Sequence, residues 1–295
     1  MDDRPSETFL NVPRLLEASA PAVRTSWFWY LAGTLLLIMM LSSYLTSRLA
    51  HAQQLIGAIS TLSLLGVVLA MMAAAWMAAR AVQREQSHLE AIEELIQLRH
   101  WEQAAGMLEA LLSKPVRQPQ SRLQGMLYLA AVLGRYHRFG DAITVYDILL
   151  RGIGSDVEGA FGIKLARAMS QLRDDRLFDV DRAISELRRA PGAGESAALA
   201  LVEIYRDVKT GHPQEAAALF AEKRPVLRRQ LGVRLADALA LAARAQDMQG
   251  NEAEAKSLYE EATLLAPEVE LARRYPEVAP LVGKYPPAMP PGEGA

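Results

Sequence analysis

The stretch Leu235–Pro267, LADALALAARAQDMQGNEAEAKSLYEEATLLAP, decides the fold of this chain. Apolar residues recur in it at spacings of three and four, which is the period of an α-helix with one buried face. Gly250 interrupts this pattern in the middle, where a tight turn needs a residue that accepts a left-handed conformation. Pro267 stops the second half, because proline cannot continue a helix. The stretch therefore predicts two helices that are joined by a turn and pack together.

The sizes of the side chains in this stretch support close packing of the two helices. Ala243 and Ala255 are small where the helices would cross most closely, while Leu239 and Tyr259 supply bulk between neighbouring helices. Together with Gly250, Ala262 and Pro267, these positions resemble the tetratricopeptide repeat (TPR), a helix–turn–helix unit of about 34 residues. The aromatic residue that the family usually carries three positions after the first small one is Gln246 here.

Weaker copies of the unit precede this stretch. They are found by using the alanine at the close crossing as a marker, and they centre on Ala104, Ala142, Ala183 and Ala216, with successive spacings to Ala255 of 38, 41, 33 and 39 residues. Glycine and proline clusters at 114–119, 152–154, 191–194, 211–213 and 250–251 divide the region into helices of ordinary length. We therefore expect an all-α fold in which residues 83–274 form an α-solenoid of TPR-like helix pairs. Another type of helical repeat and a non-repeating bundle are the alternatives.

Two uncharged apolar runs, residues 26–45 and 55–79, precede the repeat region. At about 1.5 Å per residue, each would form a helix of roughly 30 Å or more, enough to cross the hydrocarbon core of a bilayer. Aromatic residues such as Trp27, Tyr44 and Trp76 stand near their ends, as interfacial anchors do. We therefore expect a transmembrane helical hairpin over residues 26–82 and an integral membrane protein with two spans. A pair of buried helices in a soluble core is the alternative.

The flanks of the two runs predict an orientation and a role for them. Six arginines lie beside the outer ends of the runs, whereas Arg48 alone lies in the connection, so both termini are expected in the cytoplasm. Ala70, Ala74 and Ala78 recur every four residues and could support helix–helix self-association. Neither run contains a charged residue or a histidine, which favours an anchor in the lipid bilayer over a transport role.

The two ends of the chain are expected to lie outside the core. Residues 1–25 form a tail whose short apolar cluster, around Leu10 and Leu15, could lie along a membrane surface. Residues 275–295 are rich in proline and end in Gly-Glu-Gly-Ala, a composition that predicts disorder.

Composition and motifs exclude several classes of function. The chain has 295 residues, and its 32 Lys and Arg against 34 Asp and Glu leave no positive charge to attract a nucleic acid. It has no cysteine, and its five histidines lack the spacing of a zinc protease. The glycines between 152 and 162 lack the Lys-Ser/Thr of a phosphate-binding loop. We expect no catalytic residue, metal site or cofactor, and we do not expect an enzyme.

A stack of helix pairs instead offers a groove to an extended peptide. The resemblance to TPR proteins places the groove positions on the first helix of three units: Leu127, Ala131 and Arg135; Leu201, Tyr205 and Lys209; and Asp237, Arg244 and Asp247. The sequence thus predicts a membrane-anchored scaffold or adaptor that binds a protein or peptide partner. The alternatives are an envelope assembly or biogenesis factor with its repeat domain outside the cytoplasm, and a divergent enzyme or transport component.

Overall fold

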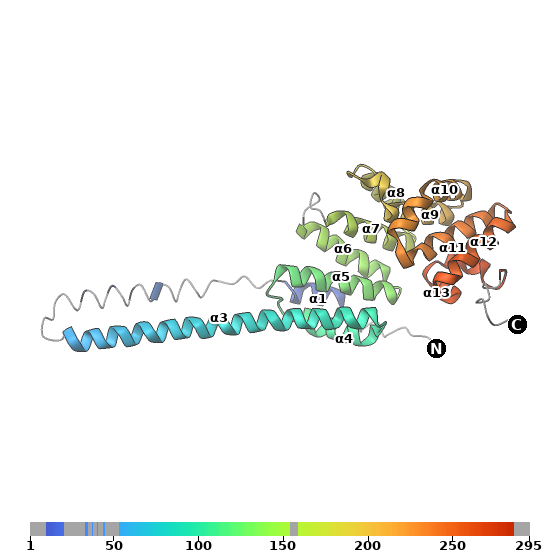
Figure 1. Ribbon diagram of the computed structural model, residues 1–295. Helices are drawn as coiled ribbons and strands as arrows, with labels where there is room; N and C mark the ends of the chain where they lie inside the picture. The colour runs from blue at the N-terminus through green and yellow to red at the C-terminus, as the bar shows by residue number, and fades with distance from the viewer. Residues whose placement is uncertain are drawn as a thin grey trace. The chain divides into compact units, whose positions relative to one another are not determined.

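The structure of the chain, a computed structural model, describes residues 10–20, 53–153 and 159–285, together with Gly33, Thr34, Leu37, Met40 and Tyr44. Of the side chains in helix α3, those of residues 53–64 and 67 are outside the description. The described residues contain helices and turns and no strand, so the expected all-α fold is confirmed for them (Figure 1). Two compact units, Met1–Tyr136 and His137–Ala295, divide the chain.

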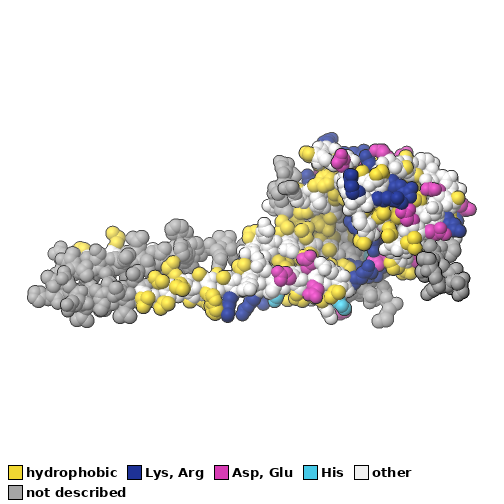
Figure 2. Space-filling model, in the orientation of Figure 1, with side chains coloured by type: hydrophobic (Ala, Val, Ile, Leu, Met, Phe, Trp, Pro, Cys, Tyr) yellow, Lys and Arg dark blue, Asp and Glu magenta, His cyan; other side chains and the backbone are white. Residues whose placement is uncertain are grey.

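In the first unit, α4 (Trp101–Leu112) packs against three other helices, α1 (Val12–Ala18), α3 (Gln53–Gln97) and α5 (Pro119–Arg135). Helix α3 also contacts α5, and Leu89 and Ile92 near its C-terminal end are buried. From Leu65 to Met77 its apolar side chains are instead exposed, and Figure 2 shows them as a hydrophobic surface along the helix. Among the described side chains of this long helix, those that are buried in the core lie in its C-terminal part.

The apolar cluster near the N-terminus belongs to this core, which corrects the expectation that it lies along a membrane surface. Leu10, Val12, Leu15 and Leu16 are buried, and α1 contacts α4. Arg122 of α5 donates to the carbonyl of Leu16 at 3.2 Å and to the hydroxyl of Ser19 at 3.3 Å, where the helix ends. The cluster is buried because α4 offers it an apolar surface within the protein.

The expectation of a two-span integral membrane protein is wrong. The first expected span, residues 26–45, lies outside the described residues except for the five isolated positions named above. Within the described part of the chain, no helix is both long and apolar enough to cross a membrane. The cytoplasmic placement of both termini rested on these spans and is withdrawn with them. Ala70 and Ala74 are exposed on α3 and Ala78 is half-buried, so their role in self-association stays a prediction.

The second unit is a succession of helices, each of which contacts its neighbours in sequence and some of the next nearest helices. These helices are α6 (Phe139–Ile153), α7 (Ala160–Arg173), α8 (Leu177–Leu187), α9 (Ala197–Thr210), α10 (Pro213–Gln230), α11 (Leu235–Met248) and α12 (Glu252–Leu265). Helix α9 contacts α7, α8, α10 and α11, while α11 contacts α9, α10 and α12. One-turn 3₁₀ helices, η1 (Ala193–Glu195) and η2 (Gly232–Arg234), precede α9 and α11. Helices α7, α9 and α11 thus form a contiguous row.

Within each helix pair, a turn of the same conformation joins the first helix to the second. It contains one residue with positive φ, and these residues are Arg99, His137, Asp175, Gly211 and Gly250. At four of these turns the next N–H donates to the carbonyl five residues before it, as from His100 to Leu95 at 2.8 Å and from Asn251 to Gln246 at 3.0 Å. This bond satisfies a carbonyl at the end of the helix, as in the Schellman motif. Glycine and proline marked two of these turns in the sequence, and the residues with positive φ in the other three carry side chains.

The turns correct one of the expected repeat positions. The fifth residue after each positive-φ residue is Ala104, Ala142, Val180, Ala216 or Ala255, and all five are completely buried. Ala183, which the sequence suggested for the third copy, is only partly buried. Val180 holds the equivalent place, and the spacings become 38, 38, 36 and 39 residues. The search for a small residue missed this position because valine is not small.

The region after α12 corrects a further expectation. Residues from 275 onward were expected to be disordered, but α13 (Glu268–Arg274) is followed by η3 (Pro276–Leu281), and both contact α11. Tyr275, Val278 and Leu281 are completely buried, and Tyr285 is nearly so. These side chains supply apolar surface that the proline-rich composition concealed. Residues 286–295 are outside the described part of the chain.

Candidate functional site: the docking face and the C-terminal segment

The predicted groove residues of α9 and α11 are covered by the chain's own C-terminal segment, Glu268–Tyr285. We call the covering residues the C-terminal segment, and we call the side chains beneath it the docking face. The docking face comprises Arg173 of α7, Tyr205 and Lys209 of α9, and Asp237, Arg244 and Asp247 of α11. Figure 1 shows α13 beside α11 in this unit.

Asp237, near the start of α11, is the centre of the first cluster of contacts. Its carboxylate accepts hydrogen bonds from Arg274 at 2.7 Å and from the Tyr275 hydroxyl at 3.2 Å. Arg234 lies 3.6 Å from the same carboxylate. Asp237 is 1% exposed, and a buried carboxylate needs such partners to offset the loss of its hydration.

The Tyr275 ring lies between side chains of two other helices. It meets the ring of Tyr205 edge to face, with 4.9 Å between the ring centroids. The guanidinium of Arg173 lies 5.5 Å from the centroid of the Tyr275 ring, within the range of a cation–π contact. This tyrosine therefore contacts α7, α9 and α11 at once.

A second, similar cluster surrounds Asp247 near the end of α11. Its Oδ1 atom accepts hydrogen bonds from Lys284 at 2.6 Å and from the Tyr285 hydroxyl at 3.1 Å. Arg244, one turn earlier, donates to Oδ2 at 2.6 Å. Lys284 also lies 3.2 Å from Glu252 of α12, and the Tyr285 ring lies 6.4 Å from the Tyr259 ring.

The two clusters share one pattern. The C-terminal segment contains two pairs of a basic residue followed by tyrosine, Arg274–Tyr275 and Lys284–Tyr285, ten positions apart. Asp237 and Asp247 are also ten positions apart, and each accepts hydrogen bonds from both side chains of one pair. A carboxylate on α11 thus recognises a cation and a phenol hydroxyl at two places.

Lys209 links the segment to α9 between the two clusters. Its ammonium lies 3.2 Å from Glu277 of the segment and 2.8 Å from Asp175 in the turn after α7. The buried Val278 and Leu281 add apolar contact along the same stretch. The docking face therefore combines charges of both signs with an apolar surface.

These contacts perturb the pKa values of several groups. Burial raises the pKa of Tyr275 to about 12, and the nearby Asp237 charge acts in the same direction. Burial also raises the pKa of Tyr205. At Asp247 burial opposes ionisation, but hydrogen bonds from Lys284 and Tyr285 prevail and lower the pKa of the carboxyl below its ordinary value. The neutral tyrosines and the ionised Asp247 are the forms that the folded chain favours.

The other predicted groove residues lie elsewhere. Leu201 is buried in the hydrophobic core of the second unit. Leu127 and Arg135 are partly buried and Ala131 is exposed on α5, which belongs to the first unit, whereas the docking face belongs to the second. Arg135 lies 5.8 Å from the centroid of the Trp101 ring.

The predicted packing residues lie in and around the α11–α12 contact. Leu239, Ala243, Ala255, Tyr259 and Ala262 are completely buried. Gly250 has φ +79° in the turn, and α12 ends at Leu265 before Pro267.

Sequence reasoning missed Arg173 and the whole C-terminal segment. Arg173 stands two residues before the positive-φ residue of its turn, as Lys209 and Arg135 do, so the correct position of the third turn would have revealed it. The segment could have been found from its repeated basic–Tyr–Pro triplets at 274–276 and 284–286.

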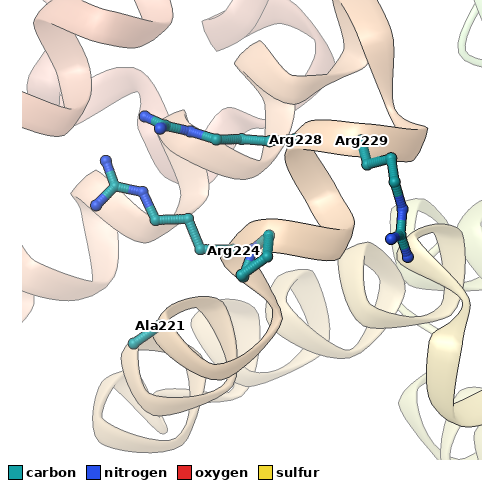
Figure 3. A pocket seen from close by; sticks show the side chains of 5 residues that line it. Ala221, Arg224, Arg228 and Arg229 are labelled. Carbon is teal, nitrogen blue, oxygen red and sulfur yellow. The ribbon is translucent and has the colours of Figure 1, made fainter.

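A pocket of about 610 Å³ lies apart from the docking face, on α10 around Pro225. Arg224 and Arg228 extend to the same side of it, while Arg229 points away (Figure 3). Glu261 of α12 already pairs with Arg224 at 3.2 Å and with Arg228 at 2.6 Å. The docking face, where segments distant in sequence converge, is therefore the stronger candidate site.

In comparisons with known proteins, no protein-family model, no curated protein and no solved structure matches the chain.

Proposed function

We propose that this chain is a scaffold or adaptor without catalytic activity, and that its TPR-like helix pairs bind an extended segment of another protein at the docking face. The observation that carries the proposal is the C-terminal segment itself. It crosses α11 and contacts α7 and α9 through buried aromatic rings and charged hydrogen bonds. A surface that holds one such segment has the chemistry to hold another.

The repeated turns support the TPR-like part of the proposal. Five turns of one conformation, each followed at the fifth residue by a completely buried side chain, indicate a structural unit of 36 to 39 residues. In helical repeats of this kind, the first helices of successive pairs line one surface and are suited to peptides. Helices α7, α9 and α11 are these first helices in the second unit.

A selection from a random-peptide display library against the full chain tests the proposed function. The docking-face variants are Lys209→Gln and Asp247→Asn, and the matched controls are Lys223→Gln and Asp179→Asn on other surfaces of the second unit. We expect peptides whose affinity changes at least tenfold with a docking-face variant and less than twofold with either control. If the selected peptides were insensitive to both docking-face variants, or if none were selected, the proposed function would be wrong.

A further inference from the structure

The two clusters on α11 differ in how firmly the chain holds its own residues there. Tyr275 and Asp237 are both almost completely buried, and Arg274 is the last residue of helix α13. The Lys284 side chain, in contrast, is 41% exposed, and it follows Gly283, whose φ of +78° marks a turn after η3. Rotation about Gly283 would therefore take residues 284 and 285 away from Asp247 and expose the Tyr285 ring, while Tyr275, Val278 and Leu281 precede Gly283 and would stay in place.

The departure of these two residues would leave a polar pocket with defined chemistry. The carboxylates of Asp247 and Glu252 both lie within 3.2 Å of the Lys284 ammonium, and Arg244 holds the second oxygen of Asp247. Tyr259 forms an aromatic wall beside the Tyr285 ring. The Tyr259 hydroxyl is buried and has no hydrogen-bond partner among the described residues.

We propose that the pocket around Asp247 and Glu252 binds a basic residue followed by tyrosine in an extended partner peptide, and that Lys284 and Tyr285 occupy it until such a peptide displaces them. This inference rests on the proposed function and specifies the partner. The Asp237 cluster is an independent instance of the same recognition, because it binds Arg274 and Tyr275 with the same two kinds of hydrogen bond.

Lys284 and Tyr285, the internal pair, lower the apparent affinity of the pocket for a partner peptide. Two residues tethered to the site by a short chain act at an effective concentration in the millimolar range, so a separate peptide must compete with them. Its apparent dissociation constant rises in proportion as the open fraction of the site falls. Removal of the internal pair should therefore strengthen the binding of an external peptide.

A labelled peptide with the sequence of residues 279–287, APLVGKYPP, tests this exchange by fluorescence anisotropy. It is titrated with the full wild-type chain, with the vacated variant Lys284→Ala/Tyr285→Ala, and with the vacated variant that also carries Asp247→Asn. We expect the vacated variant to bind at least tenfold more tightly than the wild type, and the Asp247→Asn change to abolish this gain. A control peptide with Glu and Ser in place of Lys and Tyr should not bind.

A second variant keeps the test decisive if the vacated chain does not fold. Tyr285→Phe retains the ring beside Tyr259 and removes only the hydroxyl that donates to Asp247. It should bind the labelled peptide more tightly than the wild type and less tightly than a fully vacated site. Circular dichroism of each variant establishes whether it is folded.

Three results would overturn the inference. The first is equal binding of the peptide to the wild-type chain and to both the vacated and Tyr285→Phe variants. The second is binding that Asp247→Asn leaves unchanged. The third is a concentration-dependent dimer of the wild type, measured by light scattering, that is lost in Lys284→Ala, since this would assign the pair to a second copy of the chain. If the library selection still yielded peptides sensitive to the docking face, the proposed function would stand and only this inference would fail.

Discussion

At the scale of single residues, the docking face shows what sequence reasoning can and cannot recover. Tyr205, Lys209, Asp237 and Asp247 were predicted as groove positions, and the structure brings them together beneath one segment. The C-terminal segment that covers them was not predicted, because Tyr275 and Tyr285 lie among prolines and the average composition of residues 275–295 is typical of disorder. The rings of Tyr275 and Tyr285 nevertheless order this segment, because each removes a large apolar surface from water.

The close crossing of α11 and α12 gives the first prediction. Ala255 is completely buried, so Ala255→Leu should overpack the contact and lower the free energy of unfolding by about 1–3 kcal/mol. Ala253 is exposed on the same helix, and Ala253→Leu should change that free energy by less than about 0.5 kcal/mol. Urea denaturation of the full chain, followed by circular dichroism, measures both. Equal losses would show that the packing positions are misassigned.

Tyr275 gives a prediction at alkaline pH. Its pKa is about 12 in the folded chain, against about 10 for an ordinary tyrosine in the unfolded chain. The stabilisation that follows from this raised pKa is fully present below pH of about 10 and is lost as the pH rises through about 12. Tyr275→Phe cannot ionise, so its unfolding free energy should fall less than that of the wild type over this interval. Urea denaturation across the interval measures the difference, and parallel losses would contradict the assignment.

At the scale of helices and turns, the sequence predicted the turns best where a positive φ is adopted by glycine. Gly211 and Gly250 have positive φ, and both turns were predicted. Arg99, His137 and Asp175 adopt the same conformation although they carry side chains, and no glycine or proline marks the turn at Asp175 in the sequence. The third repeat was consequently placed on Ala183 instead of Val180, and Arg173 was lost from the predicted site.

Replacing glycine by alanine should change the free energy of unfolding in opposite directions in a turn and in a helix. Gly250→Ala should lower the free energy of unfolding by about 1 kcal/mol, because alanine tolerates a φ of +79° poorly although there is space for its Cβ atom. Gly106 lies exposed inside α4 with equal space, so Gly106→Ala should raise the stability of the first unit by roughly 0.5–1 kcal/mol. Thermal unfolding of both variants distinguishes a conformational effect from a steric one, since a steric effect would not reverse between them.

At the scale of the whole molecule, the sequence predicted the structure of residues 83–274 better than that of residues 55–79. The amphipathic helices of residues 83–274 were recognised because their buried and exposed faces alternate with the helical period. The apolar run of residues 55–79 was interpreted as a span from its length, its lack of charge and the aromatic and basic residues near its ends. In the structure its described part continues without a break into the charged C-terminal half of α3, which packs on α4 and α5.

The contacts between the C-terminal segment and Asp247 should weaken at acidic pH. Hydrogen bonds from Lys284 and Tyr285 lower the pKa of the Asp247 carboxyl in the folded chain, while the unfolded value is about 3.9. The stabilisation from this lowered pKa is therefore present above about pH 4 and is lost as the pH falls through the folded pKa. Asp247→Asn should be less stable than the wild type at neutral pH, and the difference should shrink as the pH falls below the unfolded pKa of about 3.9. The exposed Glu254→Gln, measured in the same urea titrations, should show no such convergence. A difference that persisted in acid would mean that Asp247 stabilises the unit by shape and not by charge, and the pocket would then lose its reason to prefer a basic residue.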